Sequence, residues 1–365
     1  MGLPSPLGRG WTAAGAFISR SGLGEGSVYG PKDRRGLELA SSKNRVRVRK
    51  KILFSRSPDH PIHNGETSMK SFRERLAQGD ILISDGAMGT FLQARGLQPG
   101  ECPEEWCISH PEVVKGIHAA YLLAGSDILQ TNSFGGTSYK LKPYGLAGKV
   151  RELNLAAVAL AKQVIAGRGY VAAAVGPTGR IVEEEGGDAT PQDLYEAFKE
   201  QVAALAEGGA DALCIETMGS LTEALQAIKA AKDCTTLPVM CTFTFQAGAR
   251  GFHTMMGVTP ERAAREAASA GADIVGSNCG SGIANMIEIT RQMRAAQPHT
   301  PILVNANAGM PVLEEGKTVF KETPEFMASK IGDLIEAGAQ IIGGCCGTTP
   351  EHIAAIAKAA RGIAD

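Results

Sequence analysis

The stretch YVAAAVGPTG (170–179) is followed by DLYEAFKEQVAALAEGG (193–209) and then by DALCIETMGS (211–220). The first and third segments are short, continuous apolar runs, as expected for strands that are buried on both faces. In the middle segment, apolar residues such as Leu194 and Phe198 recur at intervals of three and four, which indicates an amphipathic helix. Two buried strands joined by a helix form a parallel pair. These three segments therefore predict a β-α-β unit.

The same alternation extends over most of the chain. Each apolar run is followed by a segment with helical spacing, and several of these segments begin with Pro and end on Gly, as helices do. Eight strand-helix units predict an α/β fold, a single-domain (β/α)₈ TIM barrel. A doubly wound open sheet is the alternative, but no GxGxxG loop follows the first run. The runs span residues 81–90, 127–134, 170–179, 211–220, 237–245, 273–282, 301–309 and 340–349.

Residues 1–68 differ in composition from the rest. They contain 12 Lys and Arg against five Asp and Glu, a net charge of +7, so the other residues carry −8 of the total of −1. The segment is rich in Gly, Ser, Pro and Arg and has no sustained periodicity. We expect residues 1–68 to be a disordered or non-native N-terminal extension and 69–365 to form the barrel. A transit peptide and a translated extension ahead of a natural start at Met69 both remain open as its origin.

The overall composition argues against a membrane-spanning protein, a nucleic-acid-binding protein and a disulfide scaffold. No run of 18 apolar residues occurs, so no transmembrane span is expected. A net charge of −1 gives no reason to expect nucleic acid or an anionic membrane as a partner. Eight cysteines are too few for a disulfide scaffold in 365 residues. We therefore expect a cytoplasmic, reducing environment in which the thiols are free or bound to a metal.

Polar and thiol residues end seven of the eight predicted strands. Active sites of TIM barrels form where the strands end at their carboxyl side. We therefore expect these side chains to gather at one face, although they come from distant parts of the chain. They are Asp85, Thr131 and Asn132, Thr178, Glu216 and Thr217, Asn278 and Cys279, Asn307, and Cys345 and Cys346.

The segment IIGGCCGTTPEH (341–352) places two adjacent cysteines between a glycine pair and a third glycine. The glycines allow the backbone to turn, so that Cys345 and Cys346 need not point to opposite sides. Cys279, at the end of the sixth strand, can face them across the seventh. Three thiolates at about 2.3 Å from one ion leave the fourth tetrahedral position open, as in catalytic zinc sites. Packed core cysteines or a redox pair are the alternatives, although redox pairs have the spacing Cys-x-x-Cys.

The other cysteines and the histidines do not indicate a second site. There is no HExxH and no GxSxG motif. Cys102 and Cys107 lie in the loop segment ECPEEWC without a third Cys, and they are not expected to bind a metal. We expect His118 to lie on a helix and face the core. His352 falls in the first turn of the last helix, where a surface position or a place around the site is expected.

The chain resembles the homocysteine S-methyltransferase family in seven segments, which follow in order. These are DGAMGT, TNSFGGT, GPTG, IETM, NCGSG, NAGMPVLEEGKT and GGCCGTTPEHI. The likeness is strongest to the homocysteine-binding barrel of the cobalamin-dependent methionine synthase branch. It covers about residues 69–363, and the GGCCGTTP motif within it is highly specific.

The resemblance implies roles for the residues at the strand ends. It implies that Cys279, Cys345 and Cys346 bind a zinc ion. It also implies that Asp85 and Glu216 hold the ammonium group of homocysteine through charge-assisted hydrogen bonds. An alternative role for Asp85 is to cap the following helix. Asn307 is assigned to the substrate site without a specific role.

The implied reaction is the methylation of homocysteine to methionine, with zinc lowering the pKa of the substrate thiol. The segment NAGMPVLEEGKT resembles the cobalamin-dependent branch, so we expect the donor to be methylcobalamin or another methylcorrinoid on a separate protein. Direct use of betaine, S-methylmethionine or another small donor remains open. So does a zinc-binding redox or structural barrel without methyl transfer. A metal-assisted hydrolase is less consistent, because the His and carboxylate ligands usual in such sites are missing.

Overall fold

A computed structural model of the chain describes residues 69–314 and 317–362. The predicted extension, residues 1–68, lies outside the described residues. The chain divides after Ser68, and Met69–Asp365 forms one compact unit.

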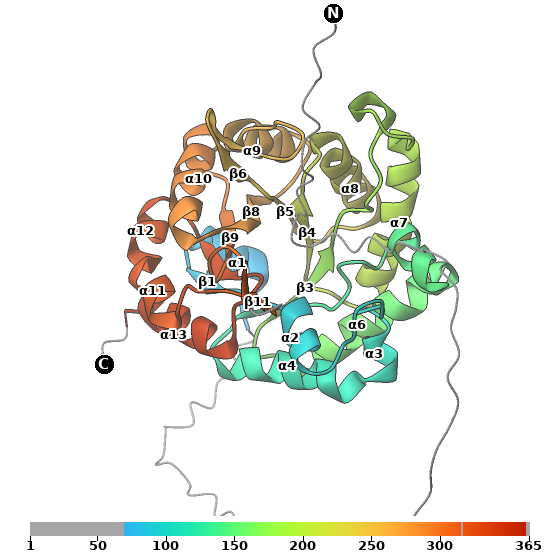
Figure 1. Cartoon of the computed structure of the whole chain (residues 1–365), viewed down its shortest axis with the longest axis horizontal. Coiled ribbons are helices and arrows are strands. Elements are labelled where there is room, and N and C mark those ends of the chain that lie inside the picture. Colours follow the sequence, from blue (N-terminus) through green and yellow to red (C-terminus); the bar gives the residue numbers. More distant parts are fainter. Residues whose placement is uncertain (1–68, 315–316, 363–365) are drawn as a thin grey trace, which may run out of the picture. The chain divides into compact units, whose positions relative to one another are not determined.

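Eight parallel strands form one sheet in the order β1-β12-β9-β8-β5-β4-β3-β2 (Figure 1). A parallel bridge between Ser84 and Ile128 links β1 to β2 and brings the sheet round into a nearly closed barrel. Each strand lies within one of the eight apolar runs, so the predicted TIM barrel is confirmed. The strands are β1 (Leu82–Ile83), β2 (Ile128–Gln130), β3 (Tyr170–Val175), β4 (Ala212–Met218), β5 (Val239–Phe243), β8 (Ile274–Gly282), β9 (Ile302–Asn307) and β12 (Ile341–Gly344).

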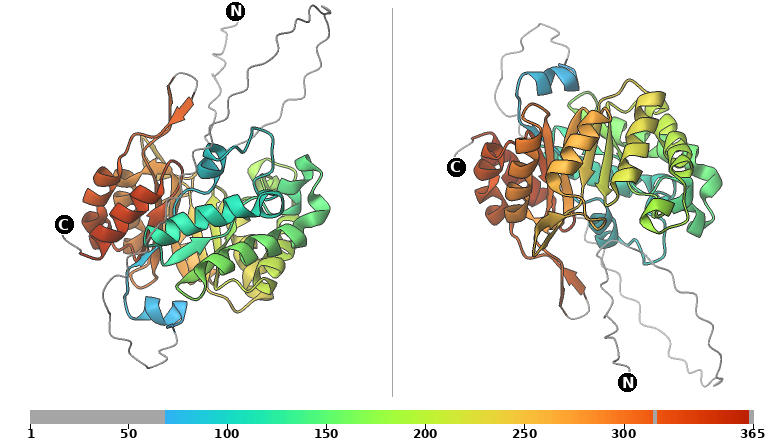
Figure 2. Two further views of the ribbon diagram at one scale, coloured as in Figure 1. Left: turned by 90° about the horizontal axis from the view of Figure 1, so that it is seen from below. Right: turned by 90° about the horizontal axis from the view of Figure 1, so that it is seen from above.

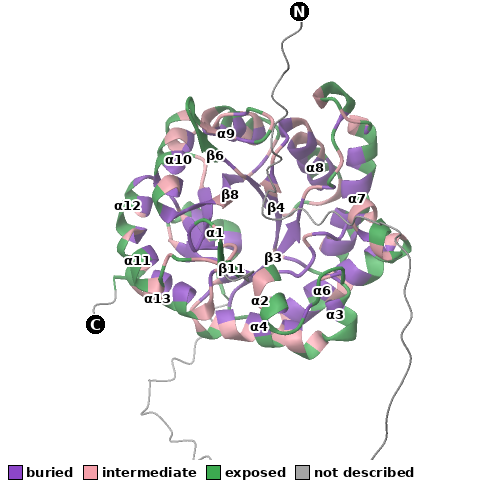
Figure 3. Ribbon diagram, in the orientation of Figure 1, coloured by how far each residue is buried: buried purple, intermediate pink, exposed green. Residues whose placement is uncertain are grey.

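Helices surround the barrel, with buried faces toward the strands and exposed faces outward (Figures 1 and 3). Among the helices that the structure describes, none has both the length and the apolar character needed to cross a membrane. The helices are α1 (Phe72–Ala77), α2 (Gly89–Ala94), α3 (Trp106–Ser109), α4 (Pro111–Leu123), α5 (Ser138–Leu141), α6 (Val150–Ile165), α7 (Pro191–Glu207), α8 (Leu221–Cys234), α9 (Pro260–Ser269), α10 (Ile283–Ala296), α11 (Pro324–Ser329), α12 (Ile331–Glu336) and α13 (Pro350–Ala360).

The segment 324–339 reads as one helix in the sequence but forms two, α11 and α12. The hydroxyl of Ser329 donates to the carbonyl oxygen of Phe326 at 2.7 Å. That carbonyl would otherwise accept from the N–H of Lys330, which instead donates to Met327 at 3.1 Å. Competition of this kind from Ser side chains is known to bend or interrupt helices.

The amino-terminal end of the barrel is closed by α1. Phe72 and Leu76 of this helix join an apolar cluster made by inward-facing residues of all eight strands. The ring of Phe72 lies 5.3 Å from that of Tyr170, whose hydroxyl donates to the carbonyl of Lys70. The side-chain amide of Gln340 donates to the carbonyl of Leu76 at 2.7 Å. Access to the barrel interior is therefore from the carboxyl end of the strands.

Two hairpins that the sequence did not predict follow β5 and β9. The first pairs β6 (Gln246–Gly248) with β7 (Gly251–His253), and the second pairs β10 (Val312–Glu314) with β11 (Lys317–Val319). Strands of three residues are too short to show a periodicity of two. Figure 2 shows the β10–β11 hairpin projecting from the barrel end opposite to α1.

His118 on α4 is fully buried, as predicted, and neither ring nitrogen has a hydrogen-bond partner. Burial lowers its pKa from 6.5 to about 4. As the pH falls from about 6.5 to about 4, the unfolded chain therefore binds a proton that the folded chain does not. We expect this difference to cost about 3 kcal/mol of stability over that range, with the contribution fully present above pH 6.5.

The measurement is urea unfolding of wild-type protein and His118→Leu at pH 7, 5.5 and 4. Leucine fills a similar volume and does not titrate, so stability should fall less steeply with acid in the variant. Equal slopes in the two proteins would show that His118 does not contribute to acid unfolding.

Candidate metal centre and substrate site

Cys345 and Cys346 lie in the turn between β12 and α13. The N–H of Cys345 donates to Ala306 at 2.7 Å, and the carbonyl of Cys346 accepts from the N–H of Ala308 at 3.1 Å. The pair is thus anchored on both sides of Asn307, at the end of β9. Because these residues have left the strand, their side chains are not bound to alternate between the two faces of the sheet.

Cys279 has a left-handed backbone conformation, with φ of +58°. Such values are uncommon for residues other than glycine and are typical of functional sites. The pairing of β8 with β9 shifts register between Asn278 and Gly282, so the strand is irregular at this point. The hydroxyl of Thr244 donates to the carbonyl of Asn278 at 2.9 Å and helps to hold the bend.

The three predicted sulfurs converge. The Sγ atoms of Cys279, Cys345 and Cys346 lie within 4.8 Å of one another, and those of Cys279 and Cys346 are 3.9 Å apart. Three sulfurs at about 2.3 Å from a tetrahedral ion are separated by about 3.8 Å, so the set fits a zinc ion. Across residues 69–314 and 317–362, it is the one group of three or more Cys, His, Asp or Glu side chains close enough to hold a metal.

The three thiols also influence one another. Hydrogen bonds from the thiols of Cys345 and Cys346 lower the pKa of Cys279. The same contacts with Cys279 raise the pKa values of Cys345 and Cys346. The cluster therefore favours one thiolate, on Cys279, and resists ionisation of all three. A bound cation would remove this resistance, since metal ligation requires deprotonated thiols.

The side-chain amide of Asn278 has a single possible orientation. Its oxygen accepts from the N–H of Thr217 at 2.8 Å and from the hydroxyl of Thr242 at 2.7 Å. Because a backbone N–H can only donate, the amide nitrogen must lie on the other side. There it donates to Glu216 Oε2 at 3.4 Å and lies 3.8 Å from Cys345 Sγ. Asn278 thus connects the sulfur cluster to a buried carboxylate.

Asp85 and Glu216 are both buried, 2% and 8% exposed, at the ends of β1 and β4. Burial, together with the charge of Cys279, raises the pKa of Glu216 to about 8. Burial also raises that of Asp85, and the charge of Glu216 adds to this. Asp85 Oδ2 accepts from the N–H of Gln130 at 2.8 Å, so it does not act as the helix cap that the sequence left open.

Several buried polar atoms near these carboxylates lack a hydrogen-bond partner. They include Asp85 Oδ1, Asn307 Oδ1, Asn305 Oδ1 and Ser84 Oγ. An unsatisfied buried acceptor costs free energy unless a ligand or water donates to it. Most are acceptors, so the site favours a ligand with several N–H donors, as an ammonium group has.

The loop after β1 is fastened to the cysteine turn. The hydroxyl of Thr348 accepts from the N–H of Ala87 at 3.1 Å and donates to the carbonyl of Cys345 at 2.8 Å. The hydroxyl of Tyr121 donates to the carbonyl of Ala87 at 2.9 Å. The carbonyl of Asp85 accepts from the N–H of Gly344, also at 2.9 Å. These contacts therefore fix the position of Asp85 relative to Cys345 and Cys346.

A family model described as homocysteine S-methyltransferase matches residues 82–360, from the first strand to the last helix. The chain belongs to the homocysteine S-methyltransferase family. The match includes all six site residues predicted from the sequence.

The relatives of this family member differ in how much of their own length the alignment covers. The methionine synthases of Mycobacterium tuberculosis and Mycobacterium leprae are each 31% identical to it, over 303 and 306 residues. The alignments cover 78% of this chain but 25% of each relative, so the chain spans a quarter of their length. The metallated form of the Escherichia coli homocysteine methyltransferase MmuM aligns with a TM-score of 0.65 and 25% identity, over 78% of this chain and 98% of that one.

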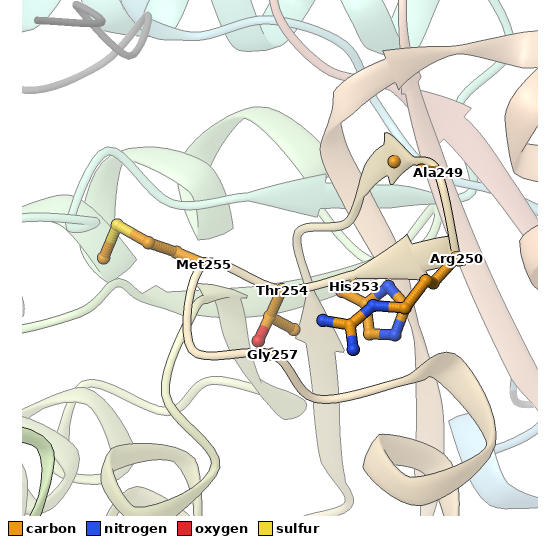
Figure 4. Close-up of a pocket in the computed structure, with 7 residues that line it drawn as sticks. Ala249, Arg250, His253, Thr254, Met255 and Gly257 are labelled. Atoms are coloured by element: carbon orange, nitrogen blue, oxygen red, sulfur yellow. The ribbon is translucent and has the colours of Figure 1, made fainter. Parts of the chain in front are cut away.

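A surface cavity of about 450 Å³ lies at the β6–β7 hairpin and the turn that follows it (Figure 4). None of the six predicted site residues lines it. It is lined by Gly248, Ala249, Arg250, His253, Thr254, Met255 and Gly257. Because none of the clustered cysteines and neither buried carboxylate lines this cavity, nothing indicates that the chemistry takes place there.

Reasoning from the sequence did not find the residues that orient the site. Asn278 was noted as a polar strand end next to Cys279, but its link to Glu216 and Cys345 was not anticipated. Thr348 and Tyr121 carried no signal of their own, since a threonine in a turn and a tyrosine on a helix are common. Cys102 and Cys107 are buried and lie outside the cluster of three sulfurs.

Proposed function

We propose that this chain binds a zinc ion through Cys279, Cys345 and Cys346 and methylates homocysteine to methionine. The observation that supports it best is the convergence of three sulfurs beside two buried carboxylates at the open end of the barrel. A bound zinc ion would supply Lewis acidity that lowers the pKa of the substrate thiol into the physiological range. A reducing location such as the cytoplasm, where all eight cysteines stay free as they are here, suits the site.

The chain's own residues would bind and orient the substrate. Asp85 and Glu216 accept hydrogen bonds from the ammonium group of homocysteine, whose charge favours their ionised forms. With the amine held there, the thiol is directed toward the cysteines. Asn278 contacts both Glu216 and Cys345 and so fixes their relative positions. Asn307 offers a free acceptor at the end of β9. Burial of the carboxylates excludes water and strengthens these contacts.

We propose a methylated corrinoid on a separate protein or domain as the donor. Support comes from the methionine synthase relatives, three quarters of whose length has no counterpart in the alignment. A small donor used directly is the second candidate, supported by the likeness to MmuM, which the alignment covers almost completely.

The test is a donor comparison with zinc-loaded protein and homocysteine, scored by methionine formed. Methylcobalamin, betaine, S-methylmethionine and S-adenosylmethionine are supplied in turn. We expect turnover with methylcobalamin; turnover with one of the others alone would reassign the donor.

X-ray absorption at the zinc edge separates a catalytic from a structural ion. We expect one additional sulfur neighbour on addition of homocysteine. An unchanged spectrum, with no methionine from any donor, would contradict the proposed function and favour a structural zinc or thiol protein.

A further inference from the structure

Three loops at strand ends carry the cysteines and Asn307, and one short segment touches all of them. The loops are the irregular end of β8 with Cys279, the end of β9 with Asn307 and the residues after it, and the turn after β12 with Cys345 and Cys346. The segment runs from Phe320 to Glu322, between β11 and α11. Each loop has a glycine at the contact. A Cβ atom at Gly282 would overlap the Glu322 carboxylate, and one at Gly347 would overlap the Phe320 ring. One at Gly309 would lie 3.1 Å from Glu322 Cγ.

The carboxylate of Glu322 caps α10, the helix that follows Cys279. Gly282 occupies the N-cap position of this 14-residue helix and has no side chain to offer. Glu322 Oε2 accepts from the N–H of Ile283 at 3.1 Å instead. A carboxylate here satisfies an otherwise free N–H and favours the helix dipole. The backbone of Gly282 is ordinary and extended, with φ of −75°, so the glycine is required by space rather than by conformation.

The backbone of Glu322 holds the other two loops. Its N–H donates to the carbonyl of Ala308 at 2.9 Å, directly after Asn307. Its carbonyl accepts from His352 Nε2 at 2.9 Å, and His352 lies in the first turn of α13. The N–H of Ala308 in turn donates to Cys346. A continuous set of hydrogen bonds therefore joins the three loops through one residue.

The ring of His352 is held in one tautomer. Nδ1 lies 3.1 Å from the N–H of Thr349, which can only donate, so Nδ1 accepts and the proton is on Nε2. That proton is the one given to Glu322. His352 is 8% exposed, so of the two positions that the sequence left open it has the one around the site and not the one on the surface.

We propose that Glu322 and His352 are positioning residues. They hold together the three loops that carry the cysteines and Asn307, and so preorganise the metal centre. The proposal rests on the proposed function, in which the three cysteines bind zinc. Neither residue reaches a sulfur. Their effect passes through the backbones of Ile283, Ala308 and α13.

Three variants and one control separate this role from an effect on overall stability. His352→Asn keeps an acceptor near the position of Nδ1 for the N–H of Thr349, but its shorter side chain has no donor at the position of Nε2, which binds Glu322. Glu322→Ala removes the cap of α10, whereas Glu322→Gln keeps an amide oxygen for Ile283. Ser71→Ala removes the cap of α1 at the opposite end of the barrel and serves as the matched control.

Zinc affinity is measured by competition with a chromophoric chelator. We expect His352→Asn and Glu322→Ala to bind zinc about tenfold more weakly, the lower range for losses around a metal site. Glu322→Gln and Ser71→Ala should bind as the wild type does. Wild-type affinity in both His352→Asn and Glu322→Ala would overturn the proposal.

Hydrogen exchange in the zinc-free proteins tests the same idea without the metal. The amide protons of Ile283, Ala308 and Cys345 should exchange faster in His352→Asn than in the wild type or in Ser71→Ala. Unchanged exchange would overturn the positioning role. Faster exchange in a chain whose wild type binds no zinc would uphold the role and overturn the proposed function.

Discussion

Replacing Cys279 with serine is expected to abolish zinc binding and to lower methionine formation by at least about 100-fold, more than the loss typical of residues around a ligand set. Serine keeps the size of the side chain, but its hydroxyl is a poor ligand where a thiolate is required. The cluster would retain two sulfurs, too few for a site with one open position. The measurement combines zinc content after dialysis with methionine formed in the presence of the active donor.

The control for this variant is Cys234→Ser. Cys234 ends α8, is partly exposed and lies outside the sulfur cluster, so its replacement should leave zinc content and activity unchanged. Circular dichroism of both variants would show that the barrel is intact. Full activity in Cys279→Ser with no bound metal would contradict the role of the three cysteines.

Replacing Glu216 with glutamine is expected to raise the KM for homocysteine by about 10- to 100-fold. A hydrogen bond to a charged group contributes about 1.5–3 kcal/mol, and each 1.4 kcal/mol is a factor of ten. Glutamine keeps the shape but places an N–H donor and no charge against an ammonium group. Because the loss concerns binding, kcat should change much less than KM.

A substrate analogue without the amine provides the control. 4-Mercaptobutanoate has the same thiol and chain length but cannot form the ammonium contact. Wild-type protein and Glu216→Gln should therefore use it about equally, if poorly. A variant that loses the same factor with both compounds would show that Glu216 acts on the thiol or on the fold rather than on the amine.

The barrel could be predicted because its signals are local. Buried strands appear as continuous apolar runs such as YVAAAV, and helices as residues repeating every three or four positions. Each of the eight strands lies within an expected run. The interruption of the helix at Lys330 and the two hairpins were missed, because one depends on a single side-chain hydrogen bond and the others on strands of three residues.

The composition of the site could also be predicted, because TIM barrels place strand ends at one face. Asp85, Glu216, Asn307 and the cysteines all reach that end of the barrel. What could not be predicted is their orientation. It depends on the left-handed conformation of Cys279 and on the amide of Asn278, whose contacts with Glu216 and Cys345 span more than 60 residues.

For the positioning residues, too, one part could be predicted from the sequence and the other could not. That α10 begins at a glycine, without a capping side chain, can be seen in the segment CGSGIANM. That Glu322 supplies the cap from 39 residues away, and that His352 holds Glu322, cannot. Periodicity and residue type are properties of neighbouring residues, and they determined the barrel and the identity of its chemical groups. Distances, tautomers and the contacts among the three loops are set by packing between distant segments, so only the tertiary structure decided how those groups meet.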